Sequence, residues 1–486
     1  MLPRWTRHGD GRTLAPGEVV GPAERLSWPR MVGFGAQHVV AMFGATFVFP
    51  LVMGLDPNVA IMFSGIGTIM FLLIVKGKVP SYLGTSASFV GGVLAIRGLF
   101  GGDTPATDAI VTGAILVVGL VVALVGLAVH FLGVQVINRV FPPVVTGAVV
   151  MLIGFGLAYV VADVYWPQDQ WIALITMVVT FVLIVAFKGF IGRIGILLGL
   201  VVGFLLSWVA DRLFGNITAF NAGTGAVDTH PRVSFDAVAS ADWIGLPNMH
   251  FPDVRFSAVL LVLPAVIALV AENVGHVKAV GEMTRTDVDP YMGRAIVADG
   301  AATALASGFG GSPTTTYAEN IGVMAATRVY STAAYYIAAI IAILFGLCPK
   351  FGALVAATPG GVLGGITVIL YGMIGLLGAK IWIENRVDFS NPVNLVPVGA
   401  GIILAIGPVK HMIGSNFTLE GIALGTVVVV AGYHLLRVIA GRGGGDGNGA
   451  GDGAAGAAGA AGAAGADVGA GGAGPRVSEP RREATG

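Results

Sequence analysis

Two glutamates and a histidine stand inside long apolar stretches of the chain, where ionisable side chains are rare. Glu272 and His276 are four residues apart, so on a helix they would share one face. Glu319 lies in a second apolar stretch, shortly after the polar segment Gly-Gly-Ser-Pro-Thr-Thr-Thr at residues 310–316. A carboxylate inside a membrane costs about 3 kcal/mol on insertion scales, and it therefore marks an ion or substrate pathway by default. We predict that Glu272 and Glu319 bind substrate or protons.

Some of these residues also have a plain structural explanation. His276 could be a helix-end histidine that packs as a hydrogen-bond partner, and this is as good an explanation as a direct proton role. Glu319 could be an ordinary acidic residue in the first turn of a helix. Gln37 and His38 form a polar pair in the first apolar stretch, and such pairs often join helices by hydrogen bonds. From the pattern alone we favour that joining role for the pair.

Enzyme motifs are missing from the sequence. Glu272 and His276 have the spacing of metal ligands, but no HExxH motif and no Cys/His cluster supplies a third ligand, which argues against a zinc hydrolase. No P-loop is present, so the sequence gives no sign of ATP hydrolysis. We expect no cofactor and no enzymatic activity. Transport driven by an ion gradient is left as the leading class.

Composition places these residues in a membrane protein that crosses the bilayer many times. Hydrophobic residues make up 55% of the 486 residues and charged residues 11%, whereas a soluble domain has about 25% charged residues. The mean hydropathy is +0.84. Lys+Arg and Asp+Glu balance at 27 each, so net charge does not indicate a nucleic-acid partner.

Apolar segments and basic loops predict the topology. We expect fourteen transmembrane segments, near residues 31–54, 57–76, 80–98, 106–131, 143–163, 170–188, 191–214, 257–280, 292–309, 312–328, 331–348, 356–379, 392–409 and 416–438. Residues 1–30 form an Arg-containing head without a signal-peptide core. Lys and Arg concentrate in alternate loops, which predicts that both termini are cytoplasmic. Residues 441–486 are rich in Gly and Ala and are predicted to be a disordered tail.

The third and tenth segments resemble each other. Each begins with a proline, Pro80 or Pro313, followed by a short β-favouring piece and a small-residue helix start. Seven segments per half make the halves inverted relative to each other, as in transporters that bind substrate at the midplane. Extended backbone in a membrane needs hydrogen-bond partners, so we expect the two short strands to pair and the half-helices to point their N-termini at one site. From the kinks alone, two bent helices without a site are an equal alternative.

At these residues the chain resembles the nucleobase–ascorbate transporter family, also called nucleobase:cation symporters, and most of all its bacterial uracil and pyrimidine permeases. The resemblance runs from about residue 25 to residue 437. It rests on four stretches, at residues 37–46, 82–87, 271–276 and 319–328.

The resemblance implies an all-α membrane fold with fourteen transmembrane segments in two inverted seven-segment repeats. Within residues 31–440, segments 1–4 and 8–11 would form a core domain and segments 5–7 and 12–14 a gate domain that the core moves against. Glu272 and Glu319 would bind the nucleobase through its N–H and carbonyl edge, with backbone at Ala87 and Ala318 completing the contacts. His38 and His276 would tune or relay the coupling proton. A homodimer in the inner (plasma) membrane is also implied.

Two positions bear on the substrate. Ala87 stands where uracil permeases of the family can place a bulky aromatic side chain, and its small size would widen the pocket. Glu319 favours pyrimidines, because purine transporters of the family often carry glutamine there. The sequence therefore predicts proton-coupled symport of uracil or a related pyrimidine. A xanthine or urate permease is the nearer alternative, and an anion transporter is the more distant one, since two carboxylates would repel an anion.

Overall fold

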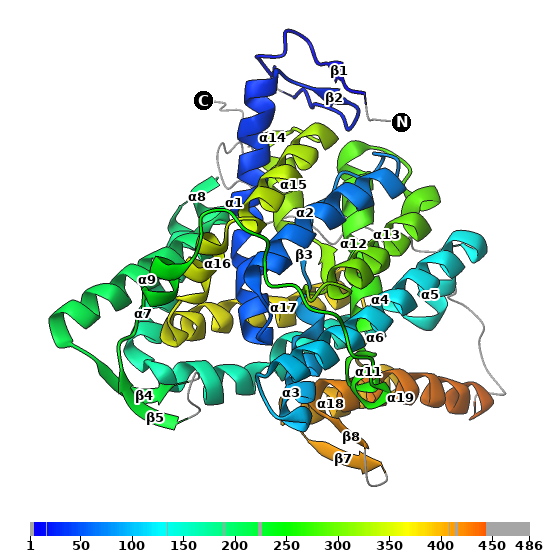
Figure 1. The fold of residues 1–486 in the computed structure, drawn as a ribbon. Helices are drawn as coiled ribbons and strands as arrows, with labels where there is room; N and C mark the ends of the chain where they lie inside the picture. The colour runs from blue at the N-terminus through cyan, green and yellow to red at the C-terminus, as the bar shows by residue number, and fades with distance from the viewer. Residues whose placement is uncertain are drawn as a thin grey trace, which may run out of the picture.

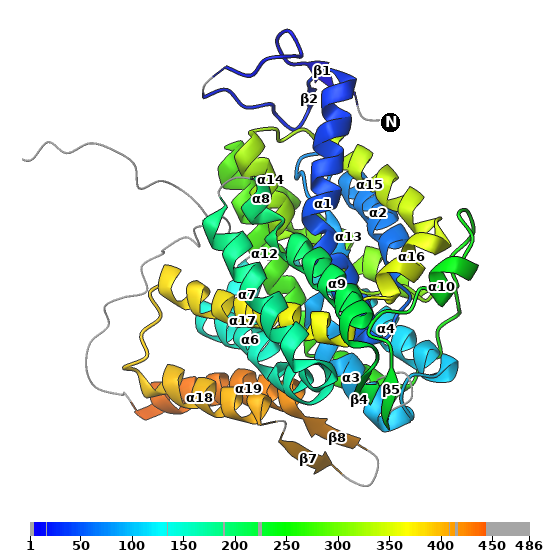
Figure 2. The same ribbon diagram turned by 90° about the vertical axis from the view of Figure 1, so that its left-hand side faces the viewer.

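The computed structural model describes residues 4–15, 17–133, 135–187, 190–221, 226–407, 409–413 and 417–443. These residues are mostly helical, and their strands form four two-stranded sheets (Figures 1 and 2). Most of the tail predicted at residues 441–486 lies outside the described residues.

The first half of the chain alternates long helices with breaks. It contains β1 (Thr6–Arg7), β2 (Glu24–Arg25), α1 (Trp28–Met53), α2 (Pro57–Ile74), β3 (Leu83–Thr85), a 3-10 turn (Ala87–Phe89), α3 (Val90–Phe100), α4 (Pro105–Leu132), α5 (Gln135–Val140), α6 (Pro143–Gly156), a π-helical turn (Val160–Tyr165), a second 3-10 turn (Trp166–Gln168), α7 (Gln170–Ala186), α8 (Phe190–Arg193) and α9 (Gly195–Phe214).

A hairpin and a long loop lead to the second half. These elements are β4 (Ile217–Asn221), β5 (Ala226–His230), α10 (Asp236–Ser240), α11 (Phe256–Val262), α12 (Ala265–Thr284), α13 (Asp289–Ser307), β6 (Thr314–Thr316), α14 (Ala318–Thr327), α15 (Thr332–Gly346), α16 (Pro349–Ala356), α17 (Gly360–Glu384), α18 (Pro392–Ile406), β7 (Lys410–Ile413), β8 (Phe417–Glu420) and α19 (Gly421–Gly443).

The helices are those of a multi-pass membrane protein. Seven helices in the described part of the chain are long and apolar enough to cross a bilayer, or up to nine if each of two bent pairs is one span. Three further apolar helices are shorter, at Ala87–Phe100, Gln170–Ala186 and Pro392–Ile406. Length and composition thus account for fewer spans than the fourteen predicted, and that number stays a prediction.

One predicted segment is bent, and another is followed directly by a bend. The segment expected at 257–280 consists of α11 and α12, which meet at an angle of 41° at Leu263 and Pro264, and α12 continues to Thr284. The segment expected at 331–348 ends at Gly346, and α16 leaves it at 82°. A proline stands at each break, where its ring and missing N–H prevent a straight helix.

The helices pack in two groups. One group joins α4 to α13, α2 to α13 and α15, and α1 to α15. The largest hydrophobic cluster comes mainly from this group and also includes buried side chains of α17. The other joins α6 to α17 and α18, α7 to α9 and α17, and α18 to α19. Both views place α18 and α19 side by side, with the β7–β8 hairpin next to them (Figures 1 and 2).

The predicted strand pairing is confirmed. Strands β3 and β6 are antiparallel, with Leu83 opposite Thr316 and Thr85 opposite Thr314. Two flanking backbone bonds extend the ladder, from Ser86 N–H to the Pro313 carbonyl at 2.9 Å and from Tyr317 N–H to the Tyr82 carbonyl at 3.1 Å. Every residue of both strands is buried. The ladder therefore satisfies backbone groups that no water reaches.

The described part of the N-terminal head is folded onto the chain. Val20 N–H donates to the Arg328 carbonyl at 2.9 Å, and Tyr330 N–H donates to the Val20 carbonyl at 2.8 Å. The Trp5 indole donates to Thr332 Oγ1 at 2.8 Å. These bonds tie the head to the joint between α14 and α15, and the first helix begins at Trp28 rather than at the predicted residue 31.

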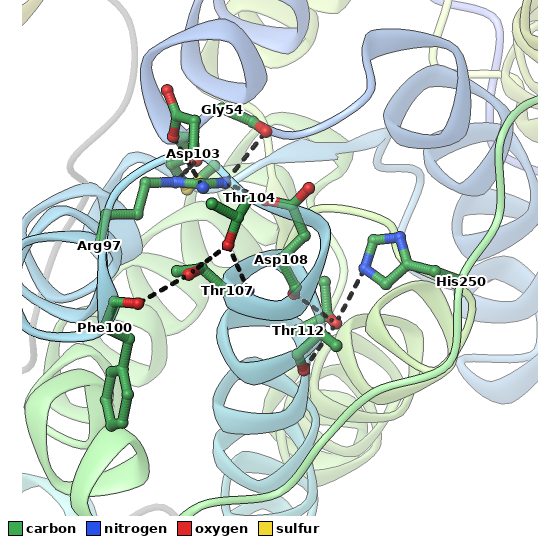
Figure 3. Close-up of polar contacts among 11 residues, drawn as sticks. Gly54, Arg97, Phe100, Asp103, Thr104, Thr107, Asp108, Thr112 and His250 are labelled. Carbon is green, nitrogen blue, oxygen red and sulfur yellow. Dashed lines mark hydrogen bonds and ion pairs between the residues drawn. The ribbon is translucent and has the colours of Figure 1, made fainter.

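Arg97 ties the end of α3 to two neighbouring helices. Its Nε donates to the Met53 carbonyl at 2.6 Å, and one Nη donates to the Gly54 carbonyl, so the guanidinium caps the last turn of α1. Its other contacts are Asp103 at 2.7 Å and Asp108, in the first turn of α4, at 2.8 Å (Figure 3). Arg97 is only 6% exposed. The α3 half-helix is therefore held at its far end by a buried cation with four oxygen partners.

We expect Arg97→Ala to lower the stability of the protein by about 3 kcal/mol, because it removes a buried guanidinium and leaves the buried Met53 carbonyl and the partly buried Asp108 without their partner. The midpoint of thermal unfolding in detergent measures the change. Arg255→Ala is the matched control: its pair with Asp253 is about half exposed, and such pairs contribute less than about 1 kcal/mol. Equal midpoints for the two variants would contradict the anchoring role of Arg97.

Candidate functional site

Helix α12 places three polar side chains beside the β3–β6 ladder. Glu272 is half-buried, and Asn273 and His276 are buried. His276 Nδ1 lies 2.9 Å from the hydroxyl of Thr316, the last residue of β6. Glu272 and His276 both lie on α12, as predicted for two residues that share a helix face. The contact of His276 with Thr316 is the hydrogen-bonding role that the sequence suggested as one explanation for this histidine.

A third carboxylate, Asp299 on α13, was missed by the sequence analysis. Its side chain is fully buried, and Asn273 Nδ2 donates to its Oδ2 at 2.9 Å. The carboxylate of Glu272 interacts electrostatically with those of Asp299 and Glu319, and the hydroxyl of Thr315 lies near both Glu272 and Asp299. The signal was available, because Asp299 is an isolated acid in the apolar stretch predicted at residues 292–309.

The start of α14 carries Ala318 and Glu319. Both are solvent-accessible although the residues on either side are buried, and many protein atoms surround Glu319. This combination describes a recess within the protein. The next residue, Asn320, points into the protein, where its Nδ2 donates to the His38 carbonyl at 3.0 Å and lies 3.1 Å from His38 Nδ1. His38 is buried and packs on the Tyr335 ring at 4.3 Å.

The two half-helices start from opposite ends of the ladder. Ala87 begins the 3-10 turn that leads into α3 and is half-buried, and Ala318 begins α14. Tyr317 links the two starts, because its hydroxyl donates to the Thr85 carbonyl at 2.8 Å. Thr46 on α1 donates in turn to the Tyr317 hydroxyl at 3.2 Å. The predicted residues Ala87 and Ala318 are thus held in a fixed relation by β3, β6 and Tyr317.

A cavity of about 230 Å³ adjoins the 3-10 turn. One wall comes from Ser88, Gly91 and Gly92 and from Pro264 at the α11–α12 bend. Gly156 of α6 and Ile422 of α19 also line it. The cavity is therefore bounded by α3, the α11–α12 bend, α6 and α19.

The chemistry of the site is acidic and uncompensated. Within the part of the chain that the structure describes, no Lys or Arg pairs with Glu272, Asp299 or Glu319. The described part of the chain holds no group of three His, Cys, Asp or Glu side chains placed to bind a metal ion. Carboxylates accept N–H groups when ionised and donate to carbonyls when protonated. The site can thus hold protons, or a neutral ligand with both donors and acceptors.

A family model described as a permease family matches residues 30–414. The chain belongs to the nucleobase–ascorbate transporter family. The Escherichia coli protein RutG, named as a pyrimidine permease, is 45% identical over 410 residues, 84% of this chain and 90% of RutG. The uracil permease of Escherichia coli is 35% identical over 422 residues, covering 84% and 92% of the two chains, and that of Bacillus subtilis is 32% identical over 426 residues, covering 83% and 91%.

Solved structures share the fold of this nucleobase–ascorbate transporter family member. Murine Slc26a9, an anion transporter in the inward-facing state, aligns with a TM-score of 0.62 over 85% of this chain and 69% of its own, at 13% identity. The transmembrane domain of the cyanobacterial bicarbonate transporter BicA aligns with a TM-score of 0.52 over 87% and 98%, at 14% identity. At these identities the likeness extends to the fold alone.

Gly84, in the middle of β3, leaves no room for a side chain in this transporter. An added Cβ would lie 2.4 Å from Tyr317 Cζ and 2.6 Å from Thr46 Oγ1. We expect Gly84→Ala to displace Tyr317 from the Thr85 carbonyl and to lower stability by about 1–3 kcal/mol. The midpoint of thermal unfolding in detergent measures this loss of stability.

Gly98→Ala on α3 serves as the control, since a Cβ there meets no atom within 4 Å. It should raise stability slightly, because alanine favours helix over glycine by about 1 kcal/mol. Two variants with the same midpoint would show that the ladder tolerates a side chain at Gly84.

Proposed function

We propose that this protein imports uracil or a related pyrimidine together with a proton. The observation that carries the proposal is the pair Glu272, within α12, and Glu319, in the first turn of α14, two interacting carboxylates that have no basic partner among the described residues. The curated relatives named as uracil or pyrimidine permeases, with 32–45% identity over more than four-fifths of the chain, support the substrate class.

The proposed binding mode follows from the donors and acceptors of the base. Uracil presents ring N–H groups next to carbonyl groups along one edge. An ionised Glu272 or Glu319 accepts from an N–H, and a protonated one donates to a carbonyl. Backbone groups at Ala87 and Ala318 complete the contacts, because the first N–H groups of a helix have no partner within it.

We assign proton coupling to Glu272, His276 and His38. A carboxylate away from water binds its proton more firmly than one in solution, so substrate and proton binding become linked. His276 contacts Thr316 of the ladder, and His38 contacts Asn320 beside Glu319. Each histidine therefore acts on the site through a residue next to it.

Transport by alternating access fits the packing. In this proposal the core comprises segments 1–4 and 8–11, the gate comprises segments 5–7 and 12–14, and the core moves against the gate in two inverted seven-segment repeats. The separation of α1, α2, α4, α13 and α15 from α6, α17, α18 and α19 supports the division. We further propose a homodimer in the inner membrane with both termini in the cytoplasm.

A xanthine or urate permease is the alternative on the same fold. The small Ala87 favours it, because the absence of a large side chain leaves room for a bicyclic base. Competition of uracil uptake by a panel of purines and pyrimidines distinguishes the two. Anion transport, the activity named for two solved neighbours, is disfavoured by three carboxylates at the site.

We expect Glu272→Gln and Glu319→Gln each to lower uptake of labelled uracil into vesicles by about 10- to 100-fold, since each removes a charged hydrogen-bond acceptor. Glu282→Gln is the matched control: this glutamate is also on α12, but it is exposed near the end of the helix. Unchanged uptake by either of the first two variants would refute the site assignment.

Accumulation of uracil should depend on the proton gradient. A protonophore added to energised vesicles should abolish accumulation while leaving equilibration of labelled base intact, because binding and exchange need no gradient. Rapid acidification of the outside of de-energised vesicles should restore a transient accumulation. Accumulation that survives the protonophore but follows a sodium gradient would replace the proton with sodium.

A further inference from the structure

The segment between α10 and α11 carries many exposed apolar side chains. Residues 241–255 contain no helix or strand, and both views show this green segment on the surface of the molecule (Figures 1 and 2). A run of large exposed apolar side chains marks a surface that binds a protein or a membrane. Those of the segment and of the first residue of α11 are 36–87% exposed: Trp243, Ile244, Leu246, Met249, Phe251, Val254 and Phe256.

Backbone bonds fix the first part of the segment on the bend between α15 and α16. Lys350 N–H donates to the Asp242 carbonyl at 2.9 Å, and Gly245 N–H donates to the Leu347 carbonyl at 3.1 Å. Leu347 directly follows α15, and Lys350 lies in the first turn of α16. The side chains around Gly245 are therefore exposed from a backbone that is held in place.

The second part of the segment is fixed on α4 and on the end of α13. Asp253 N–H donates to the Ala109 carbonyl at 2.7 Å. His250 Nε2 lies 3.3 Å from the hydroxyl of Thr112, also on α4 (Figure 3). A Cβ added at Gly310 would lie 2.6 Å from His250 Nδ1, so the segment runs in close contact with the chain that leaves α13. Both halves of the segment thus present a fixed apolar face.

These contacts lie at one boundary of the membrane-spanning region. Helices α4 and α11 begin at the segment, whereas α13 and α15 end next to it. Helix α4 and the bent pairs α11–α12 and α15–α16 are each long and apolar enough to cross a bilayer. The segment therefore follows the level at which these helices leave the hydrocarbon. The proposed topology makes this the outer side, because α1 begins at the cytoplasmic head and ends beside the start of α4, where Arg97 joins Gly54 to Asp108.

The exposed apolar surface of α15 continues into the segment. Leu344 is 61% exposed, and Leu347 lies three residues further along the chain, so the two share a helix face. The exposed apolar face of a helix that crosses a bilayer contacts lipid. Gly245 bonds to Leu347. Ile244 and Leu246, on either side of Gly245, therefore extend a lipid-facing surface beyond the end of the helix.

Two basic side chains stand beside the apolar ones. Lys350 Nζ lies 5.2 Å from the centre of the Trp243 ring, and the Arg255 guanidinium lies 5.6 Å from the centre of the Phe100 ring. Aromatic rings with Lys or Arg next to them are typical of the membrane–water interface, where the cations reach the headgroups. A protein partner fits less well, since lysine is depleted in the buried centre of protein–protein interfaces.

We propose that residues 242–256 form an interfacial belt, which lies in the headgroup region of the outer leaflet and inserts its exposed apolar side chains among the lipids. The partner is a phospholipid surface, with Lys350 and Arg255 placed to contact its phosphate groups. The fixed backbone presents these side chains in order, so little conformational freedom is lost on contact. The belt does not depend on which base the protein carries.

Depth-dependent quenching tests the belt in protein reconstituted into nanodiscs of phosphatidylethanolamine and phosphatidylglycerol. In a Cys348→Ser background, Phe251→Cys is labelled with a nitrobenzoxadiazole fluorophore. Lipids with a nitroxide near the headgroup should quench this label by about twofold, and more than lipids with a nitroxide near the chain end, because the belt lies at the interface. Quenching by aqueous iodide, with no quenching by either lipid, would overturn the belt.

Two labelled positions serve as controls. Leu124→Cys, at a position of α4 that is 64% exposed within a span, should be quenched more by the deep nitroxide than by the shallow one. Ser240→Cys, at an exposed position of α10 just before the segment, should be quenched by iodide. Efficient disulfide cross-linking of unlabelled Phe251→Cys between two copies would assign this surface to a second copy and overturn the lipid contact.

Trp243 gives a second measurement without a label. The emission lost in Trp243→Phe is that of Trp243 alone among the seven tryptophans of the chain, and phenylalanine keeps an apolar ring at this position. Lipids brominated in the upper part of the acyl chain should lower this difference emission by about twofold, whereas aqueous iodide should change it little. Difference emission that responds to iodide and not to brominated lipid would contradict the belt.

Discussion

Backbone hydrogen bonding in the absence of water is the constraint on which the rest of this structure depends. Extended residues inside a membrane protein expose N–H and C=O groups that must find partners within the protein. Here β3 and β6 supply them to each other, and the three threonines of β6 add the β-branched side chains that favour this conformation. Each strand is only three residues long and is followed by a helical segment. The starts of these two helical segments therefore lie near the acidic side chains.

The ladder also needs support from its surroundings. Thr68 on α2 accepts from Leu83 N–H at 2.9 Å, and Thr303 on α13 accepts from Thr314 N–H at 3.0 Å, which are the outward-facing groups of the two strands. One hydroxyl from each neighbouring helix thus takes the place of a third and a fourth strand. Side-chain hydroxyls from the neighbouring helices thus cover part of both edges of this sheet.

The sequence predicted these strands because proline, glycine and threonine interrupt two apolar stretches at matching places. The sequence also indicated Glu272 and Glu319 as candidate site residues, since an acidic residue is rare in an apolar transmembrane segment. Asp299 was not predicted, although it too is an acidic residue in an apolar segment, because no recognised motif lies next to it. Contacts such as that of Asn320 with His38 join residues 282 positions apart, and no local pattern specifies them. The bend at Pro264 was missed because hydropathy averages over the break, whereas the segment predicted at 331–348 ended where the second bend begins.

The docking of the N-terminal head must follow the synthesis of its partners. Trp5 and Thr332 are 327 residues apart, and Val20 pairs with backbone on both sides of Val329. The head is synthesised more than 300 residues before its partners around Arg328–Thr332. Contacts of such separation form slowly and late. The head therefore closes over the α14–α15 joint only after the helices around the ladder have been synthesised, so its docked state marks a core that is complete.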